Sequence, residues 1–314
     1  MSKTYIATGI NLKGKPFGES DRLLTILTRE FGLIRVIAPG ARKPKSRLGG
    51  RSELFVVNQL LIAKGRSLDK ITQAETVTTY AGLGQNLGKL AASQYLAELV
   101  LNQALSEHPQ EDLFILLNEH LNRLQSLPNS PLIANSTQII ATLTQGIFHL
   151  LALAGTAPQV QLCCLTQRLL RPNFADEQWR VGFSVDGGGI INLSEWTKFN
   201  SPPRPQPQKS TAIASKSLVV HESGNSYTIE TVPQPKLKIN TKLTAPQLAI
   251  LQHLAQPQLL DPASSSLSSS ISAWDWMTVE RILRQYTEYH LGYPIRSGLL
   301  IDTFTHQFIV DPPF

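Results

Sequence analysis

Residues 22–38 read RLLTILTREFGLIRVIA, two short apolar runs separated by Arg29, Glu30 and Phe31. Runs of this length, rich in Leu, Ile and Val and bounded by turn residues, are typical of β-strands. Three more runs follow the same pattern, at 4–12, 53–63 and 70–77. Five short strands with turns between them predict a small β-barrel that ends near Tyr80.

Two connections in this barrel stand out. One is the polar segment 14–22, and the other is the segment after the second quoted run, where residues 38–50 read APGARKPKSRLGG. Loops of more than about 12 residues inside compact domains are usually functional or disordered. This loop is also the most basic part of the chain. It is either an ordinary solvated loop or a place where the chain contacts phosphate groups.

The charge of the chain is concentrated at one end. Of the 29 Lys and Arg and the 23 Asp and Glu, 14 basic and 6 acidic residues lie in residues 1–80, for a net charge of +8 there. The remainder has 15 basic and 17 acidic residues, for a net charge of −2. If the partner of this protein is a polyanion, it is therefore expected to meet the N-terminal part. Few aromatic residues accompany the cations, and two of them, Phe31 and Phe55, are expected in the core, so phosphate contacts should outweigh base stacking.

After Tyr80 the apolar residues recur at helical spacing. Five segments have this pattern: 87–105, 111–125, 134–155, 244–255 and 276–292. For the fourth, Thr244 is expected as the N-cap with Pro246 in the first turn. The chain is therefore predicted to be α+β, with a barrel followed by a mainly helical part.

Two segments have the composition of flexible insertions. Residues 201–217 are rich in Pro, Ser and Gln, and residues 261–273 are rich in Ser. Such segments bury too little apolar surface to order themselves, so both are predicted to be tethers rather than packed elements.

The sequence lacks the usual signals of secretion, membrane insertion and a disulfide framework. No apolar leader follows Met1, and no stretch is expected to reach the roughly 18 apolar residues that span a membrane. The two cysteines, Cys163 and Cys164, are adjacent. We therefore expect a cytoplasmic protein without membrane partners.

Catalytic motifs are also missing. GLGQNLGKL at 82–90 has the wrong glycine spacing for a phosphate-binding loop and has Leu90 after its lysine, so no ATP hydrolysis is expected. Glu19 and Asp21 sit beside Arg22, a pattern that predicts a salt bridge in a loop rather than acid–base catalysis. We expect no catalytic residues, no metal and no cofactor.

Four stretches together resemble one family, the bacterial recombination mediator RecO. Glu19, Ser20 and Asp21 followed by RLLTILTREFGLIRVIAPGARKPKSRLGG resemble its N-terminal signature, and the Leu-rich helices after Tyr80 resemble its helical domain. PQVQLCCLT with FSVDGGGIINLSEW resembles its zinc-ribbon-like module, and QYTEYHLGYPIRSGLL resembles its C-terminal helix and the turn after it.

The resemblance implies both a fold and a function. It implies a five-stranded OB-fold barrel at 1–80 that binds DNA, a helical domain at 81–314, and a zinc-ribbon-like module at 158–200. It implies a non-catalytic protein, cytoplasmic and associated with the nucleoid, that binds single- and double-stranded DNA, anneals complementary strands and helps load RecA in the RecF pathway. The implied partners are RecR, in many species RecF, and the acidic C-terminal tail of single-strand DNA-binding protein. The DNA-contacting candidates on this chain are Arg35, Arg42, Lys43, Lys45, Arg47 and Arg51.

The zinc-ribbon-like module departs from the family pattern. Aligning Cys163 with the first metal ligand places Thr166, Asn192 and Glu195 at the other three ligand positions. A structural zinc site needs four N or S ligands, so we expect no zinc and a hairpin near 187–189 held by packing alone.

Other function classes compete with a DNA-binding mediator. A non-catalytic adaptor could bind a protein through its helices while the basic loop merely adds solubility. Such an adaptor would show no steep salt dependence toward oligonucleotides. A metal-free nuclease is disfavoured because the sequence has no cluster of carboxylates.

Overall fold

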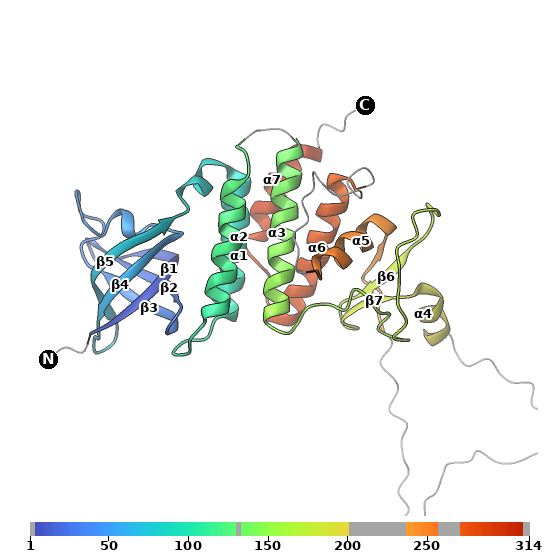
Figure 1. The fold of residues 1–314 in the computed structure, drawn as a ribbon, viewed down its shortest axis with the longest axis horizontal. Coiled ribbons are helices and arrows are strands. Elements are labelled where there is room, and N and C mark those ends of the chain that lie inside the picture. The colour runs from blue at the N-terminus through green and yellow to red at the C-terminus, as the bar shows by residue number, and fades with distance from the viewer. Residues whose placement is uncertain (1–3, 130–132, 201–236, 257–270, 310–314) are drawn as a thin grey trace, which may run out of the picture.

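The computed structural model describes residues 4–129, 133–200, 237–256 and 271–309. Its elements form three parts in a row, as Figure 1 shows: a β-barrel, a group of helices, and a small β-sheet with one short helix at the far end. The predicted α+β fold with an N-terminal five-stranded barrel is confirmed.

The barrel is closed by five strands in the order β1-β2-β3-β5-β4. They are β1 (Thr4–Phe17), β2 (Asp21–Thr28), β3 (Gly32–Ala38), β4 (Val56–Ala63) and β5 (Asp69–Thr79). All neighbours are antiparallel except β3 and β5, which pair in parallel at only two positions. Alternate residues point inward, and the interior contains Ala7, Leu24, Ile26, Val36, Leu60, Ile62 and Ile71.

The first strand is longer than the sequence predicts. Strand β1 continues through Phe17 and pairs with β2 as far as Asp21, so the predicted connection at 14–22 shrinks to residues 18–20. The end of β1, from Lys13 to Phe17, is exposed to solvent. A strand segment that buries neither face needs no alternation of apolar and polar residues, and the sequence from Lys13 to Phe17, the exposed arm of β1, therefore has none.

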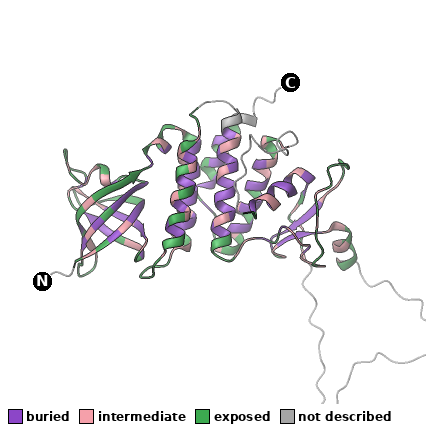
Figure 2. Ribbon diagram, in the orientation of Figure 1, coloured by how far each residue is buried: buried purple, intermediate pink, exposed green. Residues whose placement is uncertain are grey.

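The helical part is built around α3. Its main helices are α1 (Leu87–Gln103), α2 (Glu111–Ser126), α3 (Ile133–Leu153), α5 (Ala245–Leu254), α6 (Ala273–Leu291) and α7 (Gly298–Ile309). Helix α3 packs against α1, α2, α5 and α6, and Figure 2 shows the buried faces of the helices turned toward one another. The predicted cap of α5 is confirmed, because Thr244 accepts a hydrogen bond from the Gln247 N–H and Pro246 lies in the first turn. Helix α7 was not predicted from the residue pattern.

Helix α3 accounts for the most apolar stretch of the chain. Contrary to the expectation from the sequence, Ser136–Leu153 is long and apolar enough to cross a membrane, with a mean hydropathy of 1.2. However, 67% of this stretch is buried inside the protein. The neighbouring helices explain its hydropathy, as in the core of a helical domain.

The predicted insertion at 261–273 is wrong at its end. Ile271 packs against the hydrophobic core, and Ser272 is the N-cap of α6, where it forms a capping box with Asp275. Ala273 is the first residue of that helix. A serine that accepts the free N–H groups of a helix end belongs to the helix and not to a tether. The predicted insertion at 201–217 and residues 261–270 lie outside the described residues.

The third part is a three-stranded sheet with the order β7-β6-β8. It consists of β6 (Val181–Ser184), β7 (Gly189–Ile191) and β8 (Thr241–Leu243), and helix α4 (Leu193–Asn200) follows β7. Phe183 of β6 meets Tyr286 of α6 edge to face at 6.0 Å between ring centroids. The sheet is therefore anchored on the same core as the helices.

The barrel is fixed to the helices through the turn between β2 and β3. Backbone hydrogen bonds join this turn to the segment between α1 and α2: Leu33 N–H donates to Leu105 O (2.9 Å), Glu107 N–H to Phe31 O (3.0 Å) and Gln110 N–H to Arg29 O (2.9 Å). Gly32 lies at the closest approach with φ of 62°. A Cβ atom there would stand 2.1 Å from Leu105 O. The position therefore requires glycine for both its backbone conformation and its space.

Replacing Gly32 should separate the barrel from the helices. We expect Gly32→Ala to lower the free energy of unfolding by about 3 kcal/mol or more, because a clash with backbone cannot be relieved by a side-chain rotation. The matched control is Gly18→Ala, since Gly18 also has positive φ (58°) but has nothing within 4 Å of its Cβ position. That change should cost only about 1 kcal/mol. Urea denaturation followed by circular dichroism measures both, and equal losses would contradict the assignment.

Candidate nucleic-acid interface

The basic loop between β3 and β4 is an ordered chain of turns. Lys43 N–H donates to Gly40 O (3.0 Å), Ser46 N–H to Lys43 O (3.2 Å) and Gly49 N–H to Ser46 O (3.2 Å). A short 3-10 helix, η1 (Gly50–Ser52), then leads toward β4. The loop therefore has a defined path along the end of the barrel.

The start of the loop is tied to the turn between β1 and β2. Asp21 Oδ1 accepts a hydrogen bond from Gly40 N–H at 2.7 Å, and Arg42 N–H donates to Ser20 O at 2.8 Å. The expected loop salt bridge of Arg22 with Glu19 or Asp21 is wrong, because Arg22 pairs with Glu53 at 2.6 Å. Asp21 instead accepts a hydrogen bond from the Gly40 N–H. Asp21 therefore fastens the start of the basic loop and does not pair with Arg22.

The end of the loop is tied to the barrel wall by two buried asparagines. Asn11 Nδ2 donates to Arg51 O and to Glu53 O, each at 2.8 Å, and Asn58 Nδ2 donates to Arg51 O at 2.9 Å. Both asparagines are at most 1% exposed. Hydrogen bonds donated by buried side-chain amides hold the backbone in one place, because breaking them costs the carbonyl groups a donor.

Two apolar side chains complete the attachment. Ala41 is buried in the barrel core and Leu48 packs against it. The loop thus covers one end of the barrel while its charged side chains face outward.

The cations of the loop are available to a ligand. Arg42, Lys43, Lys45 and Arg47 are exposed, and Arg51 is half-buried. The Arg51 guanidinium donates to Arg47 O at 2.7 Å, and the Arg42 guanidinium donates to Gly18 O and Glu19 O, each at 3.4 Å. Among the described residues none of these five forms an ion pair with a carboxylate. Unpaired cations on a fixed backbone are suited to phosphate groups, which they neutralise with release of counterions.

A groove lies beside the loop on the outer side of β4 and β5. It has a volume of about 720 Å³, and Arg47 and Arg51 stand along it with Gln59 and Thr72. Ile6, which is 61% exposed, adds an apolar contact. Glu75 also lines the groove and is exposed, so its carboxylate offsets part of the positive charge of Arg47 and Arg51. The groove combines these two cations with neutral side chains that a base could contact, as in non-specific single-strand sites.

Aromatic side chains contribute little to this groove. Phe55 is buried as expected, whereas Phe31 is 36% exposed and meets Tyr5 edge to face at 4.9 Å, contrary to its predicted core position. Neither Phe31 nor Tyr5 lines the groove. Contact with the phosphate backbone therefore remains the main contribution expected here.

Arg35 lies apart from the other candidates. It is exposed in strand β3 opposite Thr25 of β2, and Thr25 is opposite Lys13 of β1. Residues paired across strands share a face, so Lys13, Thr25 and Arg35 form a row across the outside of the barrel. Sequence reasoning missed Lys13 and Lys15, because their neighbourhood to Arg35 depends on the strand register.

The described residues offer no metal-binding cluster of three or more His, Cys, Asp or Glu. Two histidines, His120 of α2 and His149 of α3, lie with ring nitrogens 3.2 Å apart. Burial, with contributions from His149 and Arg123, lowers the pKa of His120 to about 3. The pair is thus neutral near pH 7 and belongs to the helix interface.

The Cys163 sulfur accepts hydrogen bonds from neighbouring residues. Burial raises the pKa of its thiol, but hydrogen bonds from Asn192, Thr166 and Leu165 outweigh burial and lower that pKa below its ordinary value. The Asn192 N–H is 3.4 Å from Cys163 Sγ. Thr166 and Asn192 stand at two of the expected ligand positions, where they donate to the sulfur.

The expectation that packing alone holds this module is wrong. Gln159 N–H donates to Gly188 O (2.8 Å), Ile190 N–H to Gln159 O (3.0 Å) and Cys164 N–H to Ile190 O (2.9 Å). These bonds tie the β6–β7 hairpin to the cysteine segment.

Comparison with known proteins gives a consistent result. Residues 1–80 match the family model described as "Recombination protein O N terminal", and residues 84–190 match "Recombination protein O C terminal". The chain is 55% identical over 304 residues to the DNA repair protein RecO of a Nostoc species, with 97% of each chain covered. It is also 55% identical to the RecO of Trichodesmium erythraeum, covering 97% of this chain and 96% of that one, and 40% identical to the RecO of Synechococcus elongatus, covering 96% of each.

Removing the anchor of the loop should loosen it. We expect Asn11→Ala to lower the free energy of unfolding by about 2 kcal/mol, since Arg51 O and Glu53 O each lose a hydrogen bond, and to speed hydrogen exchange in residues 49–53. Ser46→Ala is the control, because it removes an acceptor within the loop (from Leu48 N–H, 3.2 Å) and no link to the barrel. Exchange that is equally fast in the wild type and Asn11→Ala would show that Asn11 does not order the loop.

The hydrogen-bonded Cys163 leads to an expectation about metal. The purified protein should contain zinc far below one atom per chain, and a chelator should leave its melting temperature unchanged, because a structural zinc would otherwise supply folding free energy. Metal analysis with a thermal melt tests this. One stoichiometric zinc, or a melting temperature that falls with chelator, would contradict it.

Proposed function

The chain belongs to the RecO family of DNA repair proteins, and on this premise we propose that it binds single- and double-stranded DNA without strong sequence preference, anneals complementary strands and assists RecA loading in the RecF pathway. The observation that carries the proposal is the ordered basic loop, whose exposed cations have no carboxylate partner among the described residues. Arg42, Lys43, Lys45, Arg47 and Arg51 contact phosphates in this proposal.

The attachments of the loop support such a role physically. A mobile basic loop would lose conformational freedom on binding, and that entropy would be subtracted from the affinity. Here Asp21, Asn11 and Asn58 fix the backbone beforehand. The cations can therefore neutralise several phosphates of one strand at little ordering cost. Phosphate contacts carry no base information, which suits a protein that must accept any sequence.

Annealing in this proposal requires no chemistry on the DNA. Two polyanions repel each other, and neutralising phosphates on both lowers the repulsion until base pairing brings the strands together. The protein would act by holding strands and would have no catalytic turnover. The family resemblance adds RecR, in many species RecF, and the acidic tail of single-strand DNA-binding protein as expected partners, with a location in the cytoplasm at the nucleoid.

The alternative is an adaptor that binds proteins through its helices and has a basic loop only for solubility. The two functions differ in their response to salt. An adaptor would bind its partner equally well with and without DNA, whereas a phosphate-binding protein loses oligonucleotide affinity steeply as salt rises.

Replacing the four exposed loop cations tests the proposal. If about five phosphates are neutralised, single-strand affinity in the wild type should fall with salt at a log–log slope of about −3.5, at about 0.7 per phosphate. The variant Arg42→Ala, Lys43→Ala, Lys45→Ala, Arg47→Ala, which we call the loop variant, should flatten this slope and slow annealing at least about tenfold. Fluorescence annealing and anisotropy at two salt concentrations measure both effects.

A charge-matched control separates the loop from overall charge. Arg168, Arg171, Lys238 and Lys242 are exposed in the third part of the protein, outside the groove beside the loop. Their fourfold alanine variant has the same net charge as the loop variant and should keep the slope. A loop variant with the wild-type slope would show that the phosphates bind at another site. A wild type that neither binds nor anneals DNA would favour the adaptor.

A further inference from the structure

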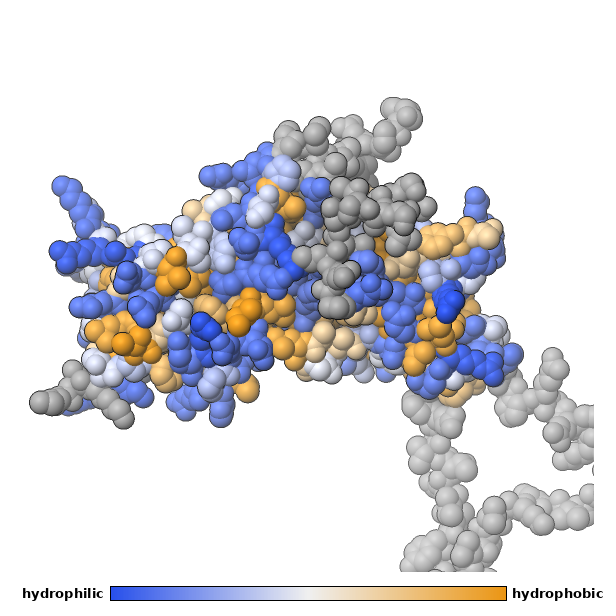
Figure 3. Space-filling model, viewed as in Figure 1, coloured by the Kyte–Doolittle hydropathy of each residue, from blue (hydrophilic) through white to orange (hydrophobic). Residues whose placement is uncertain are grey.

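A second groove, which we call the junction groove, lies between the barrel and the helices. It has a volume of about 950 Å³. One wall comes from β1 and β2 with Leu54, and the other from α1 and the segment 293–300 that leads into α7. On the face drawn in Figure 3, hydrophobic patches interrupt a largely hydrophilic surface near this junction.

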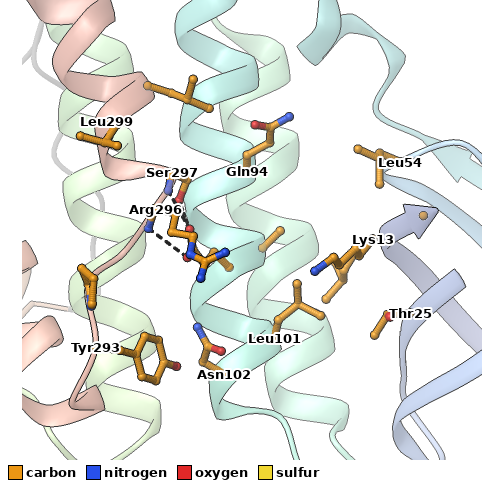
Figure 4. Close-up of a pocket in the computed structure, with 16 residues that line it drawn as sticks. Lys13, Thr25, Leu54, Gln94, Leu101, Asn102, Tyr293, Arg296, Ser297 and Leu299 are labelled. Atoms are coloured by element: carbon orange, nitrogen blue, oxygen red, sulfur yellow. Dashed lines mark hydrogen bonds between the residues drawn. The ribbon is translucent and has the colours of Figure 1, made fainter.

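Two cations enter the junction groove from opposite walls. Figure 4 shows Lys13 reaching in from the barrel and Arg296 from the helical side, each directed toward the other. Neither side chain forms a hydrogen bond or an ion pair with another described residue. Like charges directed at each other across a groove favour an anion between them.

Among the described residues that line the junction groove, the one carboxylate already has hydrogen-bond donors. Glu98 accepts hydrogen bonds from Arg296 N–H (3.0 Å), Ser297 N–H (2.8 Å) and the Ser297 hydroxyl (2.5 Å). Burial raises the pKa of Glu98, but these hydrogen bonds and the Arg296 charge outweigh burial and lower that pKa. Glu98 therefore holds the wall that carries Arg296 in place, and its charge offsets only part of the positive charge of the groove.

The other side chains that line the junction groove include aromatic, amide and apolar groups, which are of the kinds that contact nucleotides in proteins. Tyr293 is 41% exposed with its ring in the groove, and Gln94 and Asn102 present amide groups from α1. Leu299 is 69% exposed at the helical wall. An aromatic ring and apolar side chains can contact the face of a base, and amides can reach its edge.

The positive charge continues beyond the junction groove along the barrel. The row from Lys13 through Thr25 reaches Arg35, and Lys15 lies on the same face, two residues or about 7 Å along β1. All three cations are exposed. These cations lie on β1 and β3 with Thr25 of β2 between them, and a surface of this extent matches a polyanion better than it matches a short acidic peptide.

This surface is separate from the groove beside the loop. The groove beside the loop lies along β4 and β5, whereas the junction groove lies along the end of β1 and β2, on another side of the closed barrel. None of the described residues lines both grooves.

We propose that the junction groove, with Lys13 and Arg296 as its central cations and Lys15 and Arg35 along its extension, binds a second nucleic-acid strand while the basic loop binds the first. The inference rests on the proposed function and gives it a mechanism. Two strands held on one molecule meet at a much higher effective concentration than two strands in solution, so annealing becomes faster without any new contact between them.

Counting bound oligonucleotides tests the inference. With a thymidylate 10-mer, too short to occupy both surfaces, the full-length wild type should bind two molecules per chain. The variant Lys13→Ala, Arg296→Ala should bind one, with the remaining affinity within about twofold of the tighter wild-type site and with annealing slowed at least about tenfold. The loop variant should also bind one. Lys13→Arg, Arg296→Lys keeps both charges and should restore the second molecule, whereas Arg168→Ala, Arg171→Ala is the charge-matched control and should bind two.

The outcomes separate this inference from the proposed function. We call Lys13→Ala, Arg296→Ala the groove variant. A wild type that binds one molecule, or a groove variant that still binds two, would contradict the binding of a second strand at the junction groove and would leave the loop site intact. A wild type that binds none would overturn the proposed function itself. A groove variant that keeps two oligonucleotides but loses binding of an acidic peptide with apolar residues would assign the junction groove to a protein partner and overturn the inference.

Discussion

The three backbone hydrogen bonds between the β2–β3 turn and residues 105–110 determine how the parts of this protein meet. They bring the outer side of the barrel onto α1 and α2, where Leu27 of β2 and Val57 of β4 enter the same hydrophobic core as the helices. The junction groove exists because the barrel is held at this angle. Gly32 is at the centre of the contact, so a single backbone position controls both the stability of the barrel–helix interface and the shape of the groove.

The sequence predicted the elements whose burial follows a simple period. Strands such as β2 and β4 have one face in the barrel core, and α2 and α6 have one face in the helical core, so their residue patterns reveal them. The exposed arm of β1 could not be predicted in this way, because its pairing with β2 buries little and leaves no pattern. Helix α7 was also missed, although its side chains Ile301 and Phe304 are buried in the helical core.

The candidate site shows the same limit more clearly. The sequence identified the cations of the loop, because they are adjacent in the chain. It could not predict that the loop is ordered, because Asn11, Asp21 and Asn58 come from three different strands and act on its backbone at a distance in sequence. Nor could it group Arg35 with Lys13, since only the register of β1, β2 and β3 places them in one row. In the Cys163 module the family resemblance implied which positions would hold metal ligands, and the structure shows that Thr166 and Asn192, at two of these positions, donate to the sulfur.

The shared core of barrel and helices has a consequence for the synthesis of the protein. The barrel strands are complete at Thr79, but the apolar side chains on their outer side, including Ile10, Leu27 and Val57, are covered by helices that leave the ribosome later. At synthesis rates of about 5–20 residues per second, this surface faces solvent for a few seconds before α1 and α2 follow. The nascent barrel therefore passes through a stage at which it can bind chaperones or aggregate, and that stage ends only when the segment at 105–110 docks on the β2–β3 turn.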